Sequence, residues 1–102
     1  NVTHHCFDVR ELVKNYPRGE KQLIGPFTRF NPTHTIEWFK LRGVQLKAEA
    51  DGRMFPVTDS SQTIIDCYLS EARRMKVDVR TQIGVYNLEE HNGKCKVLTN
   101  RN

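Results

Sequence analysis

Two arginines stand beside proline-containing bends, where a planar guanidinium can bind a carboxylate or a phosphate in a fixed orientation. Arg53 lies within EADGRMFPVTDSSQ, residues 49–62, and Arg18 lies within YPRG, residues 16–19. Spacing alone favours a plainer interpretation, in which both are surface turn residues or pair with the acidic residues beside them. Arg53 is thus a candidate for orienting an anionic group, with a structural role as the alternative.

The segment THHC places His4, His5 and Cys6 together near the N-terminus. Adjacent ligands rarely converge on one metal ion without distant partners, and the sequence offers none that are evident. A cysteine nucleophile needs a base and an orienting group that meet it in space, which adjacency in sequence does not provide. An exposed terminal segment is therefore the favoured interpretation. Tyr16, His34 and Tyr68 are weaker acid-base candidates, and a structural role is favoured for each.

A phosphate-cradling loop requires closely spaced glycines, because the backbone must approach the phosphate. The glycines have neither Gly-x-Gly nor Walker spacing; they stand at positions 19, 25, 43, 52, 84 and 93. The sequence therefore predicts no phosphate loop of its own.

The chain is mildly basic, with a formal net charge of +4 and a pI near 9.2. Arg73, Arg74, Lys76 and Arg80 cluster around the expected end of a helix, where they complement the helix dipole. A nucleic-acid patch is the alternative, but aromatic residues are not interleaved with these charges. We expect no nucleic-acid partner.

Length, cysteines and hydropathy set the broad class. A chain of 102 residues with 37% hydrophobic and 27% charged content is expected to form a single unit, 1–102, around one core. The three cysteines are odd in number and widely spaced, which favours reduced thiols in a cytoplasm over a disulfide framework. Apolar runs are too short to span a bilayer, and the N-terminus lacks the apolar centre of a signal peptide.

The first half of the chain reads as three helices. A short helix is predicted over 7–15 with Asp8 as its cap, and a second over 20–30 that Gly25 and Pro26 weaken. In NPTHTIEWFKLRG, Asn31 suits the cap and Pro32 the first turn, while Ile36, Phe39 and Trp38 face inward and Gly43 ends the helix.

The second half alternates between strands and one long helix. Residues 44–50 alternate apolar and polar positions, the Asp51-Gly52 pair favours a tight turn, and RMFPV returns as the partner strand. A helix is predicted from Ser60 to Met75, with Asp59 as cap and Gln62 completing a capping box. Three β-rich segments follow, VDVR, IGVYNLEE and CKVLT, and Asn92-Gly93 joins the last two as a hairpin. The predicted fold class is α+β: helices, a β-hairpin, a long helix and three terminal strands.

Four motifs in this order resemble one family, the bacterial FAD-dependent flavoproteins or NAD(P)/FAD-dependent oxidoreductases, which include aminoacetone oxidase and a bile-acid dehydro-reductase. NVTH, residues 1–4, resembles the end of the family's Gly-Arg-Cys-Asn-x-Thr-Asn, with His4 in the place of the usual Asn. YPRG resembles its Tyr-Pro-Arg, and WFKLRG its Phe-Phe-x-x-x-Gly helix end. EADGRMFPVT resembles its Glu-x-x-Gly-Arg-x-Phe-Pro-x-Ser, with Thr58 in the place of Ser.

The resemblance implies an internal segment of an FAD-binding oxidoreductase, whose phosphate loop precedes these residues. It implies that Asn1 and Thr3 contact the flavin, that Arg53 lies near the flavin and substrate cavity, and that backbone groups of Val85 meet the adenine. FAD carries the redox chemistry in such enzymes, NAD(P)H is an expected electron donor, and the substrate is a small molecule. The segment alone is expected to be inactive and prone to self-association through apolar cut faces. The alternative from charge is a small basic module that binds an acidic partner or RNA.

Overall fold

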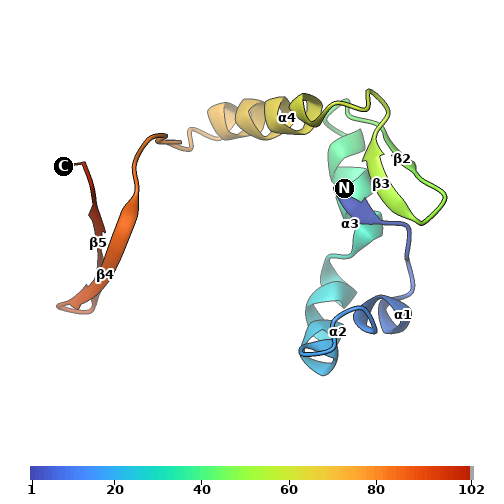
Figure 1. Cartoon of the computed structure of the whole chain (residues 1–102), viewed down its shortest axis with the longest axis horizontal. Helices are drawn as coiled ribbons and strands as arrows, with labels where there is room; N and C mark the ends of the chain where they lie inside the picture. The colour runs from blue at the N-terminus through green and yellow to red at the C-terminus, as the bar shows by residue number, and fades with distance from the viewer. Residues whose placement is uncertain (102) are drawn as a thin grey trace. The chain divides into compact units, whose positions relative to one another are not determined.

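The computed structural model describes residues 1–101, and it is drawn from the N-terminus to the C-terminus in Figure 1. Contacts group the chain into two compact units, Asn1–Glu71 and Ala72–Asn102. Length favours a single unit, and whether residues 1–102 act as one segment of a longer enzyme stays a prediction. Each unit is described by itself below. Helices and antiparallel strands occur together, which confirms the α+β class.

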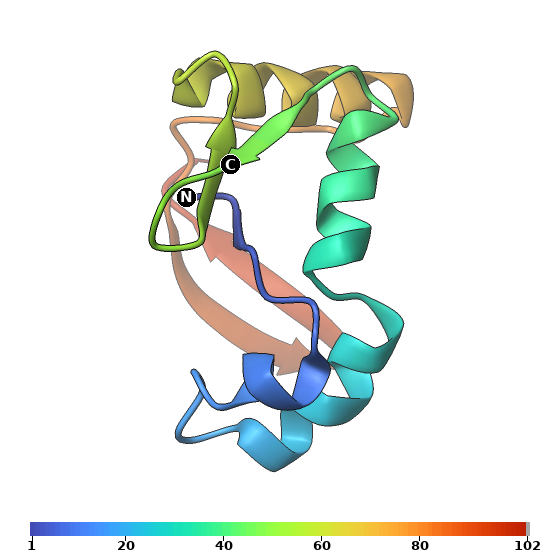
Figure 2. The same ribbon diagram turned by 90° about the vertical axis from the view of Figure 1, so that its right-hand side faces the viewer.

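Two short helices open the first unit and contact each other (Figure 2). Helix α1 (Val9–Val13) is capped as predicted, since the Asp8 carboxylate accepts the backbone N–H groups of Arg10 and Glu11 at 2.9 and 3.2 Å. Helix α2 (Glu20–Arg29) continues through Pro26. Proline removes one backbone donor, yet the bond from the Phe30 N–H to the Pro26 carbonyl still closes the last turn at 2.9 Å.

Helix α3 (Pro32–Lys40) has the predicted ends. The Asn31 side chain accepts the Thr33 N–H at 2.9 Å, and the Asn31 N–H donates to His34 Nδ1 at 3.0 Å, so a histidine completes this capping box. Gly43 adopts φ +79°, and the Val44 N–H then donates back to the Phe39 carbonyl at 2.9 Å. The turn after α3 therefore directs the chain into the sheet.

The first unit contains a three-stranded antiparallel sheet in the order β1-β3-β2. Strands β2 (Leu46–Ala48) and β3 (Arg53–Pro56) form the predicted hairpin, with Ala48 opposite Met54. Strand β1 (Thr3–His4) pairs with the other edge of β3 and was not predicted. The central strand β3 therefore carries a neighbour on each side.

The core lies between α3, the sheet and helix α4 (Ser61–Arg74). Phe39 is 1% exposed, as its inward orientation predicts, and packs with Val44 and Cys67. Trp38 packs against this cluster, whereas Ile36 is only half-buried. The partly buried apolar residues around the core are Val2, Trp38, Leu46 and Ile64. The α4 helix thus joins the sheet through one apolar face.

The predicted cap of α4 is wrong. Asp59 has φ +55° and its carboxylate binds Lys47 Nζ at 2.7 Å, which turns it away from the helix. Ser60 takes its place, since Ser60 Oγ accepts the Gln62 N–H at 3.3 Å. The Gln62 side chain instead donates to Asp66 at 2.7 Å, one turn onward, so it does not complete a capping box. Among the described residues, no helix is both long and apolar enough to cross a bilayer.

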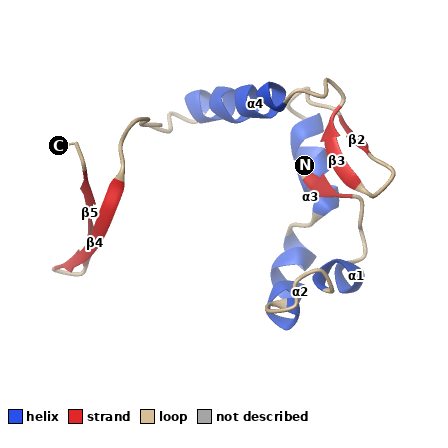
Figure 3. Ribbon diagram, viewed as in Figure 1, coloured by secondary structure: helices blue, strands red, loops and turns tan. Residues whose placement is uncertain are grey.

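The second unit contains a two-stranded antiparallel hairpin, β4 (Val85–His91) and β5 (Lys94–Thr99), whose labelled strands are red in Figure 3. The predicted turn is confirmed, because Asn92 and Gly93 have φ of +50° and +70°. Residues 77–80 were expected to form a third strand, and that prediction is wrong. They gain no strand neighbour among the described residues, and Asp78 pairs with Arg80 at 2.7 Å instead.

Candidate functional site

The β1 and β3 strands bring the motif residues near one another. Thr3 lies opposite Met54, and His4 lies opposite Arg53. Side chains alternate across a sheet, so Thr3 shares the face of buried Met54, whereas Arg53 shares the opposite face with Phe55. The structure therefore brings Thr3 and Arg53 onto neighbouring strands but points their side chains to opposite faces.

A tight turn at Gly52 holds Arg53 in place. Gly52 has φ +87°, a conformation that favours glycine, and the His4 ring lies directly over it. A Cβ at this position would stand 2.7 Å from His4 Nε2. The turn conformation thus favours glycine, and a larger residue would also require the His4 ring to move.

Arg53 pairs with Asp51 at the rim of a pocket of about 530 Å³, which we call the acidic pocket. Its Nε lies 2.7 Å from Asp51 Oδ2, and its backbone N–H donates to Asp51 Oδ1 at 3.1 Å. Both bonds lower the pKa of the Asp51 carboxyl, and the backbone bond has the larger effect. The guanidinium also lies 5.4 Å from the Phe55 ring centroid. The structural alternative for Arg53, an ion pair with Asp51, is the arrangement present.

Carboxylates outnumber cations around Arg53. Glu49, Asp51 and Asp59 line the acidic pocket, and Arg53 is the one basic side chain among its lining residues. An anionic ligand entering here would meet three carboxylates, two of which pair with Lys47, and a guanidinium that is already engaged. The immediate surroundings of Arg53 therefore oppose anion binding in this conformation.

Asn1 and Thr3 line a different pocket, of about 310 Å³, which we call the aromatic pocket. Leu12 and Pro32 are its buried members, and Tyr16, Phe27 and Phe30 form its aromatic walls. Tyr16 and Phe27 contact each other with centroids 5.5 Å apart. Residues of β1, α1, α2 and α3 thus converge on the two predicted flavin-contacting residues, a grouping that no local motif indicates.

Val85 begins β4 in the second unit, opposite Thr99. Next to this pair, Gly84 and Asn100 are hydrogen-bonded, since the Asn100 N–H donates to the Gly84 carbonyl at 3.0 Å. The Val85 N–H lies on the opposite side of its peptide plane from the Gly84 carbonyl, so it points away from β5 toward the open side of the strand. The register of the pair then shifts between Val85 and Asn87. The open side of β4 has no neighbouring strand among the described residues. The Val85 N–H, one of the two backbone groups expected to meet an adenine, is therefore directed outward.

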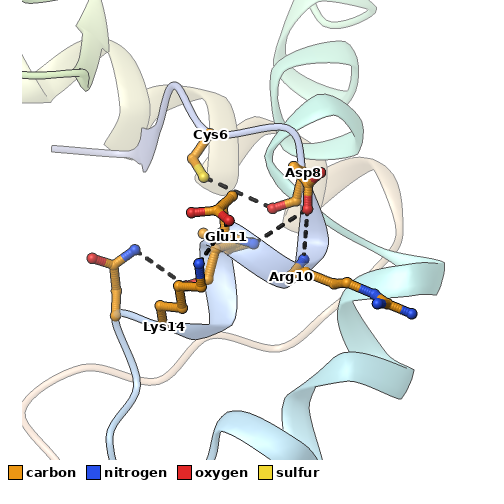
Figure 4. Close-up of polar contacts among 7 residues, drawn as sticks. Cys6, Asp8, Arg10, Glu11 and Lys14 are labelled. Atoms are coloured by element: carbon orange, nitrogen blue, oxygen red, sulfur yellow. Dashed lines mark hydrogen bonds and ion pairs between the residues drawn. The ribbon is translucent and has the colours of Figure 1, made fainter.

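The residues of THHC do not gather around one point. His4 lies over Gly52, and His5 contacts the Phe7 ring edge-on at 4.6 Å. Cys6 Sγ lies 3.9 Å from the Asp8 carbonyl at the start of α1, as Figure 4 shows. In the part of the chain that the structure describes, no group of three or more metal-ligating side chains occurs.

The remaining acid-base candidates have structural contacts. His34 Nδ1 accepts the Asn31 N–H in the α3 cap, and Tyr68 packs against Trp38 and Phe39 with centroids 5.5 Å apart. Arg73 and Arg74 occupy the last turn of α4, where they complement the dipole as predicted. Tyr16 alone among these candidates lines the aromatic pocket.

An α+β segment with an outward-facing strand edge and two motif-lined pockets fits one part of a cofactor-binding domain. Residues 1–102 match the family model described as HI0933-like protein Rossmann domain, over the entire chain. The chain therefore belongs to this family, a family of FAD-binding oxidoreductases. The described strands all pair antiparallel, and the sequence lacks a Gly-x-Gly loop, so the phosphate-binding turn of a dinucleotide fold is not found among these residues.

Proposed function

We propose that this chain contributes the flavin-proximal and adenine-proximal elements of an FAD-dependent oxidoreductase. The observation that carries the proposal is the family match across residues 1–102. In this proposal Asn1 and Thr3 contact the flavin, Val85 meets the adenine through its backbone, and Arg53 acts near the substrate cavity. Bound FAD would supply hydride transfer, with NAD(P)H as donor and a small molecule as the other reactant.

The residues fit two parts of FAD and leave a third to other residues. Asn1 and Thr3 present amide and hydroxyl groups at the aromatic pocket, which suits a flat ring with a polar edge. The outward N–H of Val85 suits an acceptor nitrogen of an adenine. A pyrophosphate needs closely approaching backbone amides or unpaired cations. Arg53, the cation of the acidic pocket, is paired with Asp51, and the aromatic pocket has no lysine or arginine, so we expect no FAD turnover by these 102 residues alone.

Arg53 has a narrower role than anion capture in this proposal. Its bonds to Asp51 hold the turn and place the guanidinium over Phe55. From there it can influence a neighbouring flavin electrostatically without releasing its carboxylate partner. We also expect the protein to work in a cytoplasm, in keeping with three free cysteines.

The test is the visible absorption spectrum of the intact gene product that contains this segment, purified without added cofactor. We expect a bound-flavin spectrum that bleaches when NAD(P)H is added under exclusion of oxygen. A colourless protein that also fails to take up added FAD would overturn the proposal. Titration of the 102-residue chain with FAD is the matched control, and catalytic turnover there would contradict the expected need for further residues.

A further inference from the structure

Arg18 differs from Arg53, the other arginine beside a proline-containing bend, in having no partner. Its guanidinium makes no hydrogen bond or ion pair with any residue that the structure describes, and the residue is exposed. Arg53 is instead held by Asp51 at 2.7 Å. Arginine presents a planar fork of donors that matches a carboxylate through two parallel hydrogen bonds. Arg18 is therefore the arginine of this pair that an outside carboxylate can reach.

A β-turn fixes the backbone around Arg18. The Gly19 N–H donates to the Tyr16 carbonyl at 3.1 Å, which closes the turn. Pro17 occupies the second position of this turn, where its fixed φ is favoured. The Tyr16 N–H donates at 2.9 Å to the carbonyl of Val13, the last residue of α1, and α2 begins directly after Gly19. Arg18 thus stands on a backbone that is held at both ends.

The carboxylates nearest to Arg18 in the sequence act on Lys14. Lys14 Nζ binds Glu11 Oε1 at 2.7 Å, and Figure 4 draws both side chains. The pKa of Lys14 is raised first by this hydrogen bond and, more weakly, by the charge of Glu20. Residues 14–21 carry three basic side chains and one acidic side chain. The charges around Arg18 therefore favour an anionic ligand, unlike those of the acidic pocket.

Arg18 lines a pocket of about 420 Å³, which we call the Arg18 pocket. Tyr16, Pro17 and Leu23 supply its apolar walls. The Tyr16 ring packs on Phe27 with ring centroids 5.5 Å apart, which fixes that wall. Among the described residues that line this pocket there is no acidic side chain, and Arg18 is the one charged member. The volume lies within the range of small-molecule pockets and suits one ring with a short chain.

Neither the charge nor the apolar walls would hold a ligand alone. An ion pair that is open to solvent contributes little, because water screens it and both side chains lose freedom. Removing apolar surface from water favours binding in proportion to the area removed, so a ring that lies against the walls adds to the effect of the charge. The Arg18 pocket therefore selects a ligand that offers both features.

We propose that the Arg18 pocket binds a small organic carboxylate, whose charged end pairs with the Arg18 guanidinium and whose ring or chain lies against Tyr16 and Leu23. The proposal goes beyond the flavin function, because none of the residues assigned to FAD or to the substrate cavity lines this pocket. Tyr16 is the one residue that lines both this pocket and the aromatic pocket.

The experiment titrates 3-phenylpropionate, its uncharged amide and acetate into the whole 102-residue chain. Binding is followed by NMR shifts of the backbone amides and of the Arg18 Nε–H. We expect 3-phenylpropionate to shift residues 16–19 and to bind roughly three- to five-fold more tightly than its amide, as an exposed ion pair allows. It should bind roughly ten-fold more tightly than acetate, which lacks the apolar body. Equal binding of the amide or of acetate, shifts confined to other surfaces, or tighter binding of inorganic phosphate would each overturn the proposal.

Variants locate the site. Arg18→Gln removes the charge and keeps a long polar side chain, so it should weaken 3-phenylpropionate binding about three-fold or more and leave binding of the amide unchanged. Arg10→Gln is the matched control, because Arg10 is an exposed arginine of α1 that lies outside the Arg18 pocket, and it should leave the binding of both probes unchanged. Equal losses in the two variants would assign the effect to net charge and overturn the location.

Lumiflavin, an uncharged flavin ring without phosphates, tests whether the Arg18 pocket is separate from the aromatic pocket, where the proposed function places the flavin contacts of Asn1 and Thr3. We expect lumiflavin to leave bound 3-phenylpropionate in place. Displacement of 3-phenylpropionate by lumiflavin would overturn the proposal of a separate site. The flavin function is read independently, from the absorption spectrum of the intact product, so a colourless product would leave the carboxylate site standing.

Discussion

Arg42 Nη2 lies 3.0 Å from Glu71 Oε1, and this contact ties the end of α3 to α4 across 29 residues of sequence. The same guanidinium stacks 3.8 Å from the Trp38 ring centroid and donates to the Trp38 carbonyl at 2.9 Å. Both partners of the ion pair are largely shielded, with side chains 26% and 19% exposed. Solvent therefore screens this pair less than it screens a surface pair.

Arg42→Ala should lower the free energy of unfolding by about 2 kcal/mol, because it removes a charged hydrogen bond and the cation–π contact together. Urea denaturation followed by the fluorescence of Trp38, the one tryptophan, measures this directly. Arg53→Ala is the control, since its ion pair is solvent-exposed and should contribute little. Equal losses in the two variants would contradict the assignment of Arg42 as the tie between α3 and α4.

Gly52→Ala should destabilise the sheet by at least about 1 kcal/mol, because alanine is strained at φ +87° and its Cβ would meet the His4 ring. Gly25→Ala should change stability far less, since the added carbon has open space beyond its chain neighbours and the helical gain offsets its crowding against Pro26. Thermal unfolding of the two variants gives the comparison. Adding His4→Ala to Gly52→Ala should recover part of the loss, and no recovery would show that the turn alone sets the requirement.

Local chemistry predicts the elements whose signals are short-range. Asn31 and Gly43 predict both ends of α3, and the Asp51-Gly52 and Asn92-Gly93 pairs predict both hairpins. Strand β1 could not be predicted, because two residues carry no pattern. It exists because β3 has a free edge, where the Val2 and His5 N–H groups find the Met54 and Gly52 carbonyls at 2.8 and 2.7 Å.

The candidate site likewise has one part that local sequence predicts and one part that it does not. The motif around Arg53 can be recognised in the sequence. Residue spacing does not show whether the guanidinium pairs with a neighbouring carboxylate or is available to another group. The structure shows the bond to Asp51, and whether Arg53 also acts on a flavin stays a prediction. The aromatic pocket needs side chains from four separate elements, so no single segment indicates it. Asp59 fails as the α4 cap for a related reason, since Lys47, twelve residues earlier, takes its carboxylate.

Cys67 should make stability depend on pH in the alkaline range. Burial raises the pKa of its thiol, so the unfolded state releases the proton at lower pH than the folded state. Stability is then unchanged by this group at low pH and falls as pH rises past the ordinary thiol pKa of about 8.5 and through the raised folded pKa. Urea midpoints between pH 7 and 10 measure the fall, and Cys67→Ala should flatten it. An identical slope in that variant would assign the dependence to other groups.

The three thiols should differ in reactivity in the order of their exposure. Cys95 is exposed, Cys6 is half-buried and Cys67 is buried in the core. Iodoacetamide should therefore modify Cys95 first and Cys67 last, with Cys67 protected until urea unfolds the first unit. Peptide mass mapping over time gives the order. Early modification of Cys67 would contradict its place between Phe39 and Val44.

Arg53→Ala in the intact gene product tests whether the paired guanidinium also serves the flavin. If it acts on the flavin from over Phe55, its loss should slow flavin reduction by NAD(P)H roughly ten-fold or more while the unfolding midpoint stays unchanged. Stopped-flow absorbance gives the reduction rate, and urea denaturation gives the midpoint.

Asp51→Asn separates the two roles of the arginine, because it weakens the ion pair and leaves the guanidinium in place. If the charge of Arg53 acts on the flavin, the rate of flavin reduction should be far higher in the Asp51→Asn variant than in the Arg53→Ala variant. Equal slowing in both variants would mean that the intact turn, rather than the charge, matters. Unchanged rates in both would return Arg53 to a purely structural role, consistent with the three carboxylates of the acidic pocket around it.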